Sequence, residues 1–159
     1  MSDLPATASP RLMTALRYWE RKRGGRPFPS RADIRLAEVP RLVGHLVIAE
    51  LIPEPTDFRF DFVGAAVRHW LQTDLAGRRM TEHPAMARVL ENWATVVREK
   101  RPHFVEAPYI ARSGSVVSAQ DMLMPLGDDE AVNAVMAVLE FAVPMPGFVS
   151  QANRARNAA

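Results

Sequence analysis

Three phenylalanines at alternate positions are the strongest constraint on the fold of this chain. Phe58, Phe60 and Phe62 are separated by charged residues, and successive side chains of a β-strand point to opposite faces of a sheet. The pattern predicts a strand with one apolar and one solvated face. A nearly continuous apolar run, residues 46–52, precedes it and is typical of a buried strand. The short connection over residues 53–57 favours an antiparallel hairpin.

A helix with clear start and stop signals precedes these strands. Ser9-Pro10 is typical of a helix N-cap with proline at the first helical position, and Gly24-Gly25 supplies the stop. We therefore predict a helix over residues 10–23. Either Ser30 or Asp33 is expected to cap a second short helix.

The second half of the chain alternates between helix and strand patterns. A short helix is predicted over residues 65–71 and a long one over residues 84–101, whose apolar stripe is centred on Trp93. Turns at Ser113-Gly114 and Gly127-Asp128-Asp129 separate three further strands. These predicted strands are residues 103–111, 116–126 and 131–141.

Several short motifs occur within these elements. They are Tyr18-Trp19, Lys22-Arg23-Gly24-Gly25-Arg26, Pro29-Ser30-Arg31-Ala32-Asp33-Ile34, Phe60-Asp61-Phe62-Val63-Gly64 and Asp74-Leu75-Ala76-Gly77-Arg78. In these motifs the chain resembles a bacterial family of small PAS-domain proteins. The resemblance covers residues 16–144. It implies an α+β, PAS-like fold, with a five-stranded antiparallel sheet, helices on one face and an N-terminal flanking helix.

The motifs and the composition together divide the chain into four parts. We expect a disordered N-terminus over residues 1–9 and an N-terminal helical extension over residues 10–45. The PAS core is expected over residues 46–144, and a disordered tail over residues 145–159.

Composition and missing motifs narrow the function classes. The chain has no cysteine, which excludes disulfides, thiol catalysis and a cysteinyl-flavin photosensor. It has no run of about 18 apolar residues and no signal-like start, so we expect a cytoplasmic protein without a membrane span. Gly-x-Ser-x-Gly, Gly-x-x-x-x-Gly-Lys and Gly-x-Gly-x-x-Gly are all absent. We therefore expect no catalytic residues and no enzyme activity.

Positive charge is unevenly distributed along the chain. Residues 1–45 contain nine Lys and Arg against four Asp and Glu, whereas residues 46–153 contain nine against fourteen. The predicted core is thus acidic, although the pI is about 9.5. This distribution favours a protein-facing basic surface over a nucleic-acid groove.

A PAS sheet and its helices enclose a small cavity, which directs attention to the large side chains that face it. The candidate ligand-pocket residues are Phe58, Phe60, Phe62, Trp70, Trp93 and Asp121. The simpler interpretation of the aromatic residues is that they form a solid core, as most such stripes do.

The histidines do not form a metal or haem site. His45, His69, His83 and His103 are dispersed, and none lies inside the helix predicted over residues 84–101. No pair has the spacing of metal ligands on a helix. We expect no metal and neither haem nor flavin as a cofactor.

The resemblance implies a stand-alone sensory or regulatory module that binds a small apolar ligand, a protein partner or both. No kinase, cyclase or DNA-reading motif occurs in the sequence, so the signal is expected to pass through an interface. Leu12, Leu16 and Trp19 form an apolar stripe on the first helix, which predicts a homodimer through this helix. The alternative is that the stripe packs on the protein's own sheet.

Two other functions stay open. A small cone-shaped isomerase or dehydratase also sets helices against a curved sheet, and it needs a carboxylate or histidine with a shifted pKa in an apolar cavity. Asp121 is the best-placed residue for that role. An Arg-rich nucleic-acid-binding protein is the other alternative, and the acidic core disfavours it.

Overall fold

One five-stranded antiparallel sheet organises the molecule, with the strand order β2-β1-β5-β4-β3. The computed structural model describes residues 4–142. The strands are β1 (Leu46–Pro53), β2 (Thr56–Val63), β3 (His103–Ile110), β4 (Val116–Asp128) and β5 (Ala131–Phe141). β5 lies in the centre and pairs with both β1 and β4. The predicted α+β class and the antiparallel hairpin of β1 and β2 are confirmed.

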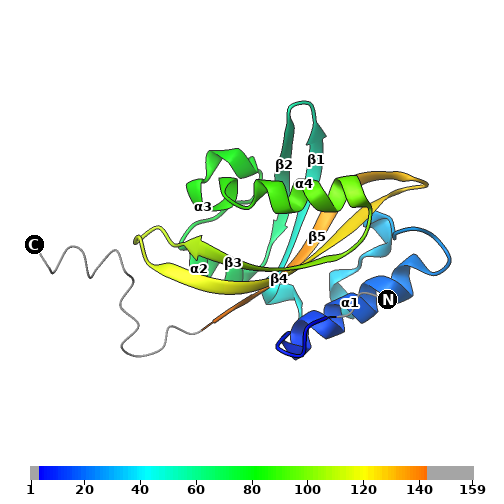
Figure 1. Cartoon of the computed structure of the whole chain (residues 1–159), viewed down its shortest axis with the longest axis horizontal. Helices are drawn as coiled ribbons and strands as arrows, with labels where there is room; N and C mark the ends of the chain where they lie inside the picture. Colours follow the sequence, from blue (N-terminus) through cyan, green and yellow to red (C-terminus); the bar gives the residue numbers. More distant parts are fainter. Residues whose placement is uncertain (1–3, 143–159) are drawn as a thin grey trace, which may run out of the picture.

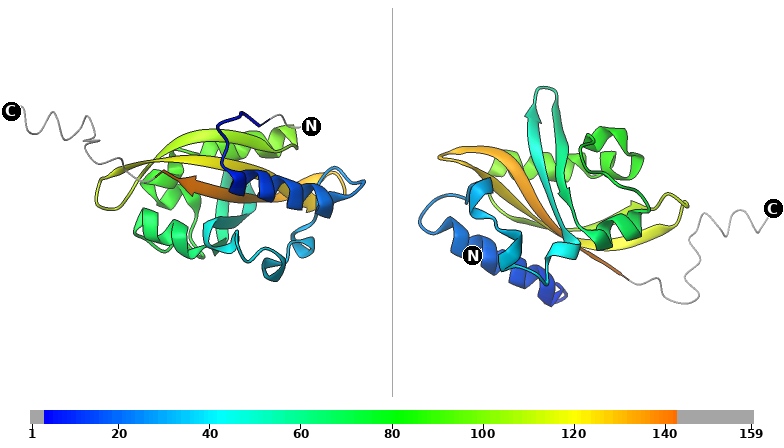
Figure 2. Two further views of the ribbon diagram at one scale, coloured as in Figure 1. Left: turned by 90° about the horizontal axis from the view of Figure 1, so that it is seen from below. Right: turned by 180° about the vertical axis from the view of Figure 1, so that it is seen from behind.

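Helices cover both faces of this sheet (Figures 1 and 2). Three of them are inserted between β2 and β3 and lie on one face: α2 (Ala65–Leu71), α3 (Pro84–Ala87) and α4 (Leu90–Glu99). The opposite face is covered by α1 (Pro10–Arg23), which contacts β4 and β5. Short 3₁₀ turns at Arg31–Asp33, Leu36–Glu38 and Val43–His45 connect α1 to β1, and a fourth, Met80–Glu82, precedes α3.

The first helix begins and ends where its signals predict. The Ser9 hydroxyl oxygen accepts a hydrogen bond from the Arg11 N–H at 3.3 Å, and Pro10 occupies the first helical position. Gly24 ends the helix with φ +56°, a conformation that glycine adopts without steric cost.

Each face of the sheet has its own apolar core. Alternate residues of β4 and β5 face opposite sides, so odd-numbered residues pack under α2–α4 and even-numbered ones pack under α1. We call the first cluster the helix-pair core, after its main cover by α3 and α4, and the second the α1 core. The α1 core contains residues from both the N-terminal extension and the sheet. The extension therefore shares a core with the sheet and is part of the same folding unit.

Two expectations about local structure are wrong. The helix predicted over residues 84–101 is divided into α3 and α4 by a turn at Arg88 and Val89. The short helix expected near Ser30 is replaced by successive 3₁₀ turns, in which Asp33 accepts from the Ser30 N–H at 2.9 Å. This bond is typical of a helix start, but the extended backbone of Ile34 and Arg35 ends the first turn after three residues.

Residues 4–9, which we expected to be disordered, have defined positions. The Ser9 N–H donates to the Gln120 side chain at 2.9 Å, and the Gln120 amide donates to the Thr7 carbonyl at 2.9 Å. These bonds attach the segment to β4. The expected disorder of residues 1–3 and 145–159 lies outside the described residues, and so do residues 143 and 144 of the expected core. Within residues 4–142, no helix is long and apolar enough to cross a membrane.

Candidate ligand site in the helix-pair core

An aromatic group from β2 and α4 occupies the middle of the helix-pair core. Phe58 and Phe60 each make an edge contact with Trp93, with ring centroids 5.5 and 6.4 Å apart. All three side chains are almost completely buried. The apolar face of β2 therefore meets the stripe of α4 at Trp93.

A second aromatic group lies at the end of β5. Trp70 of α2 is partly buried and stacks on Phe141 with centroids 5.7 Å apart, and Tyr109 of β3 makes an edge contact with Phe141 at 5.7 Å. The sequence pattern singled out Trp70 but neither Tyr109 nor Phe141.

Phe62 does not belong to this site, contrary to our expectation. The register of β1 with β2 shifts between Ile48 and Ala49, which pair with Phe62 and Phe60, so Asp61 is an extra residue on β2. Such a bulge reverses the side on which the following residues lie. Phe62 therefore packs against the α1 core, on the other face of the sheet.

Asp121 is the most unusual group in the helix-pair core. It lies on β4 and is 1% exposed, and the Tyr109 hydroxyl donates a hydrogen bond to its Oδ2. Its other oxygen, Oδ1, has no partner among the described residues. Burial raises the pKa of Asp121 from 3.8 to about 7, although the hydrogen bond from Tyr109 opposes this shift. Burial, with the neighbouring Asp121 carboxyl, raises the pKa of Tyr109 well above 10.

Trp93 carries a second unpartnered polar atom in the same core. Its ring nitrogen Nε1 is buried and has no hydrogen-bond partner in the part of the chain that the structure describes. A buried polar group without a partner costs about 1–3 kcal/mol, and most such groups in native proteins are paired. The helix-pair core therefore contains one unpaired acceptor or donor on Asp121 and one unpaired donor on Trp93.

Five of the six predicted pocket residues lie on the α2–α4 side of the sheet, in two groups. Phe58, Phe60 and Trp93 form one group, whereas Asp121 bonds to Tyr109 in the other group, where Trp70 stacks on Phe141. The strand pattern alone does not identify Tyr109, because only the antiparallel register shows that odd-numbered residues of β3 and β4 share one face.

The stripe predicted as a dimer contact is buried within the protein, so the prediction of its role is wrong. Leu12, Leu16 and Trp19 are 0%, 7% and 4% exposed and belong to the α1 core. The Trp19 ring N–H donates to the Pro125 carbonyl of β4 at 2.8 Å. The stripe is apolar because it packs on the sheet.

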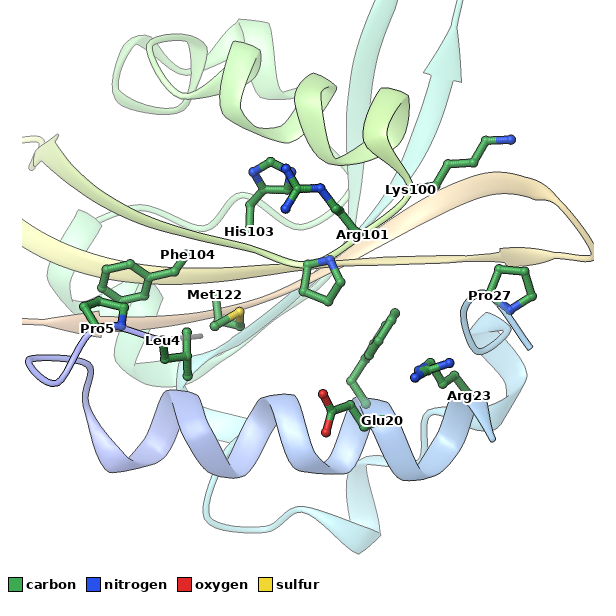
Figure 3. A pocket seen from close by; sticks show the side chains of 12 residues that line it. Leu4, Pro5, Glu20, Arg23, Pro27, Lys100, Arg101, His103, Phe104 and Met122 are labelled. Atoms are coloured by element: carbon green, nitrogen blue, oxygen red, sulfur yellow. The ribbon is translucent and has the colours of Figure 1, made fainter. Parts of the chain in front are cut away.

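A separate groove of about 620 Å³ opens on the α1 side of the sheet (Figure 3). It lies between the end of α1 and the junction of α4 with β3. We call it the basic groove because Arg23, Lys100 and Arg101 line it, and Glu20 is the acidic residue of its lining.

No metal site is evident between residues 4 and 142, since no three histidine or acidic side chains gather there in a suitable arrangement.

A family comparison agrees with this architecture. Residues 7–139 match the model of the PAS domain family. The chain therefore belongs to the PAS domain family. A search of curated proteins finds no match.

Solved structures of similar fold share little sequence with the chain. A light-oxygen-voltage domain studied with a flavin analogue is 13% identical, with a TM-score of 0.53 over 77% of this chain and 93% of that one. The aureochrome1 LOV domain in its light state is 10% identical, with a TM-score of 0.50 over 78% and 99%. VqmA bound to DPO is 13% identical, with a TM-score of 0.53 over 68% of this chain and 58% of that one. The match thus spans little more than half of VqmA, and these likenesses establish the fold alone.

Proposed function

We propose that this protein is a sensory or regulatory module whose helix-pair core binds a small, mainly apolar molecule and signals by contact with another protein. The observation that carries the proposal is the unpaired Oδ1 of Asp121 in an otherwise apolar, aromatic core. A ligand that hydrogen-bonds to this oxygen would offset the cost of burying it.

The surroundings limit the ligand that we propose. Phe58, Phe60 and Trp93 offer aromatic edges and faces, so most of the molecule has to be apolar. Asp121 and the Trp93 N–H can each bond one polar group. We propose neither haem nor flavin as the ligand, because aromatic side chains already pack against each other here. VqmA, a protein of similar fold, has a solved structure in which it is bound to DPO.

The signalling contact is the second half of the proposal. PAS domains often form dimers and protein contacts, and a homodimer remains our proposal for this chain. Its contact has to use residues outside the buried stripe. Met13 is 40% exposed on the outer side of α1, beside the exposed Arg17, and offers a surface of that kind.

Native mass spectrometry of the purified protein tests the ligand. We expect a retained small molecule in the natural sequence, lower occupancy in Asp121→Asn and unchanged occupancy in the control Met136→Leu, whose side chain lies in the α1 core. In the ligand-free protein Phe60→Ala should cost less than the ~3–5 kcal/mol typical of a solid core. If no molecule is retained, if no compound from a screening library raises Tm and if Phe60→Ala has the full cost, the proposal is wrong.

One observation favours a second function, general acid–base catalysis. A carboxyl with a pKa of about 7 is suited to proton transfer near neutral pH. The cone-shaped fold that motivated this alternative is not the fold observed, since the chain has PAS topology. Turnover of any retained molecule that is lost in Asp121→Asn would favour this function over the sensory one. Nucleic-acid binding has no structural observation in its favour, and we still expect affinity for random duplex DNA weaker than about micromolar at physiological salt.

A further inference from the structure

We propose that the basic groove is a binding site for a small anion, a phosphate or carboxylate joined to a short apolar group. It lies on the face of the sheet opposite the candidate ligand site (Figures 1 and 3). Its volume of about 620 Å³ is within the range of ~300–1,000 Å³ common for small-molecule pockets. A site of this size suits a small molecule better than a macromolecule.

Charge is the first argument. Arg23 comes from the last turn of α1, whereas Lys100 and Arg101 follow α4, so residues far apart in sequence place three cations around one groove. Arg101 pairs with Glu99 at 2.6 Å. Among residues 4–142, no carboxylate lies within ion-pair distance of Arg23 or Lys100. An anion in the groove would supply the missing partner.

The backbone of Lys100 is the second argument. Lys100 has φ +55° and ends α4 in the left-handed conformation, where helices usually have glycine. The helix dipole explains a cation near this terminus. It does not require a lysine in a left-handed position, which strains any side chain, although Gln72 ends α2 in the same conformation. Figure 3 shows the Lys100 side chain extending away from the other lining residues, so its ammonium group has to turn toward a bound anion.

The floor of the groove is the third argument. Trp19, Phe104 and Met122 line it, and the Arg23 guanidinium lies 5.8 Å from the Trp19 ring centroid. Phe104 is half-buried and Trp19 is 4% exposed, whereas Met122 is completely buried. This surface can contact a short apolar group but is too small for a long acyl chain. We therefore infer an anionic head with a short tail.

The N-terminal segment completes the groove. Leu4 and Pro5 form part of its wall, and the bonds of Gln120 to Ser9 and Thr7 hold this segment against β4. The groove is thus enclosed by three parts of the chain.

Titration with hexyl phosphate and hexanoate, followed by NMR, tests the proposal. We expect saturable shifts of the Trp19 indole N–H and the Met122 methyl group, with binding in the millimolar range or tighter. Inorganic phosphate should bind more weakly, because it lacks the apolar group. Whichever of the two compounds binds with the higher affinity identifies the head group as phosphate or carboxylate. Binding of anionic phosphatidylglycerol vesicles without shifts by either compound would contradict the proposal, and so would equal affinity for inorganic phosphate.

Three single variants separate binding from stability. Lys100→Gly removes the cation and relieves the backbone strain at this position. We therefore expect an equal or higher Tm together with a two- to fivefold loss of affinity for the anion. Arg23→Gln should have a similar effect on affinity, and both changes together should cost about tenfold. The matched control is Arg17→Gln, which removes the same charge from the exposed side of α1. Unchanged affinity in Lys100→Gly, or an equal loss in Arg17→Gln, would show that the groove is not the site.

Discussion

The two faces of the sheet differ in whether their buried polar groups have hydrogen-bond partners. On the α1 side, the Trp19 ring N–H donates to the Pro125 carbonyl at 2.8 Å, whereas on the α2–α4 side the Trp93 ring N–H has no partner among the described residues. Both tryptophans are buried to a similar degree. Figure 1 shows α4 and α1 on opposite sides of the sheet. The difference indicates that α1 serves stability and that the helix-pair core contains an uncompensated cost.

The two tyrosines show the same contrast. The Tyr18 hydroxyl accepts from the Arg35 N–H at 3.0 Å and lies 3.2 Å from Glu38 Oε1, near the surface. The Tyr109 hydroxyl is fully buried and bonds to a carboxyl group that burial leaves half-paired. Proteins tolerate such exceptions chiefly at functional sites, which is the reason for proposing the ligand site in the helix-pair core.

Removal of α1 is the change with the largest expected effect. A chain that starts at Gly24 loses Leu12, Leu16 and Trp19 and exposes the α1 core. Burial of each large apolar side chain contributes ~1.5–3 kcal/mol, and the total stability of a domain is only ~5–15 kcal/mol. We expect loss of cooperative unfolding and of dispersed NMR signals. A folded chain starting at Gly24 would show that α1 is an accessory helix after all; a chain lacking only residues 1–3 is the control.

The apolar stripe of α1 shows which structural features could be predicted from the sequence and which could not. Period and caps predicted α1 and all five strands close to their observed limits, because these signals are local. The stripe showed that one side of α1 is covered but not by what, since a sheet and a second protomer offer the same kind of apolar surface.

The errors in predicting the residues of the candidate site have a different cause. Alternation placed Phe62 beside Phe58 and Phe60, but the extra residue Asp61 depends on how β1 pairs with β2, and no pattern within one strand records that pairing. Tyr109 was missed for the same reason, because its bond to Asp121 depends on the register between β3 and β4. Contacts between elements therefore required the structure.

The pH dependence of stability is the next largest effect and tests the helix-pair core alone. Below pH 3.8 Asp121 is protonated in both the folded and the unfolded chain, so it does not make the free energy of unfolding depend on pH. As pH rises from 3.8 to about 7, the unfolded chain releases this proton first, and the free energy of unfolding falls. Each unit of difference in pKa is worth about 1.4 kcal/mol, so the loss from this group approaches roughly 4 kcal/mol above pH 7.

Urea unfolding at pH 5 and pH 8 measures this slope. Asp121→Asn should remove the part of the slope that Asp121 supplies and should be more stable than the natural sequence at pH 8. Glu106→Gln, an exposed change on the neighbouring strand β3, should leave the slope as it is. Identical slopes in Asp121→Asn and the natural sequence would mean that Asp121 does not hold its proton in the folded state.

The smallest expected effect is the most direct test of the contrast between the two tryptophans. Trp19→Phe and Trp93→Phe remove the same volume, but only Trp19→Phe breaks a hydrogen bond, the one to the Pro125 carbonyl. In the ligand-free protein we expect Trp19→Phe to cost about 3 kcal/mol more than Trp93→Phe, because Trp19→Phe loses a bond worth ~0.5–1.5 kcal/mol and Trp93→Phe removes the ~1–3 kcal/mol cost of an unpaired buried donor. A bound ligand that accepts from the Trp93 N–H should reduce this difference, because the stabilisation it gives falls in Trp93→Phe and not in Trp19→Phe. Denaturant melts of both variants, with and without a retained or added ligand, measure the two differences. Equal costs in the ligand-free state would show that the Trp93 N–H already has a partner, such as a buried water, and that the two faces of the sheet satisfy their polar groups equally.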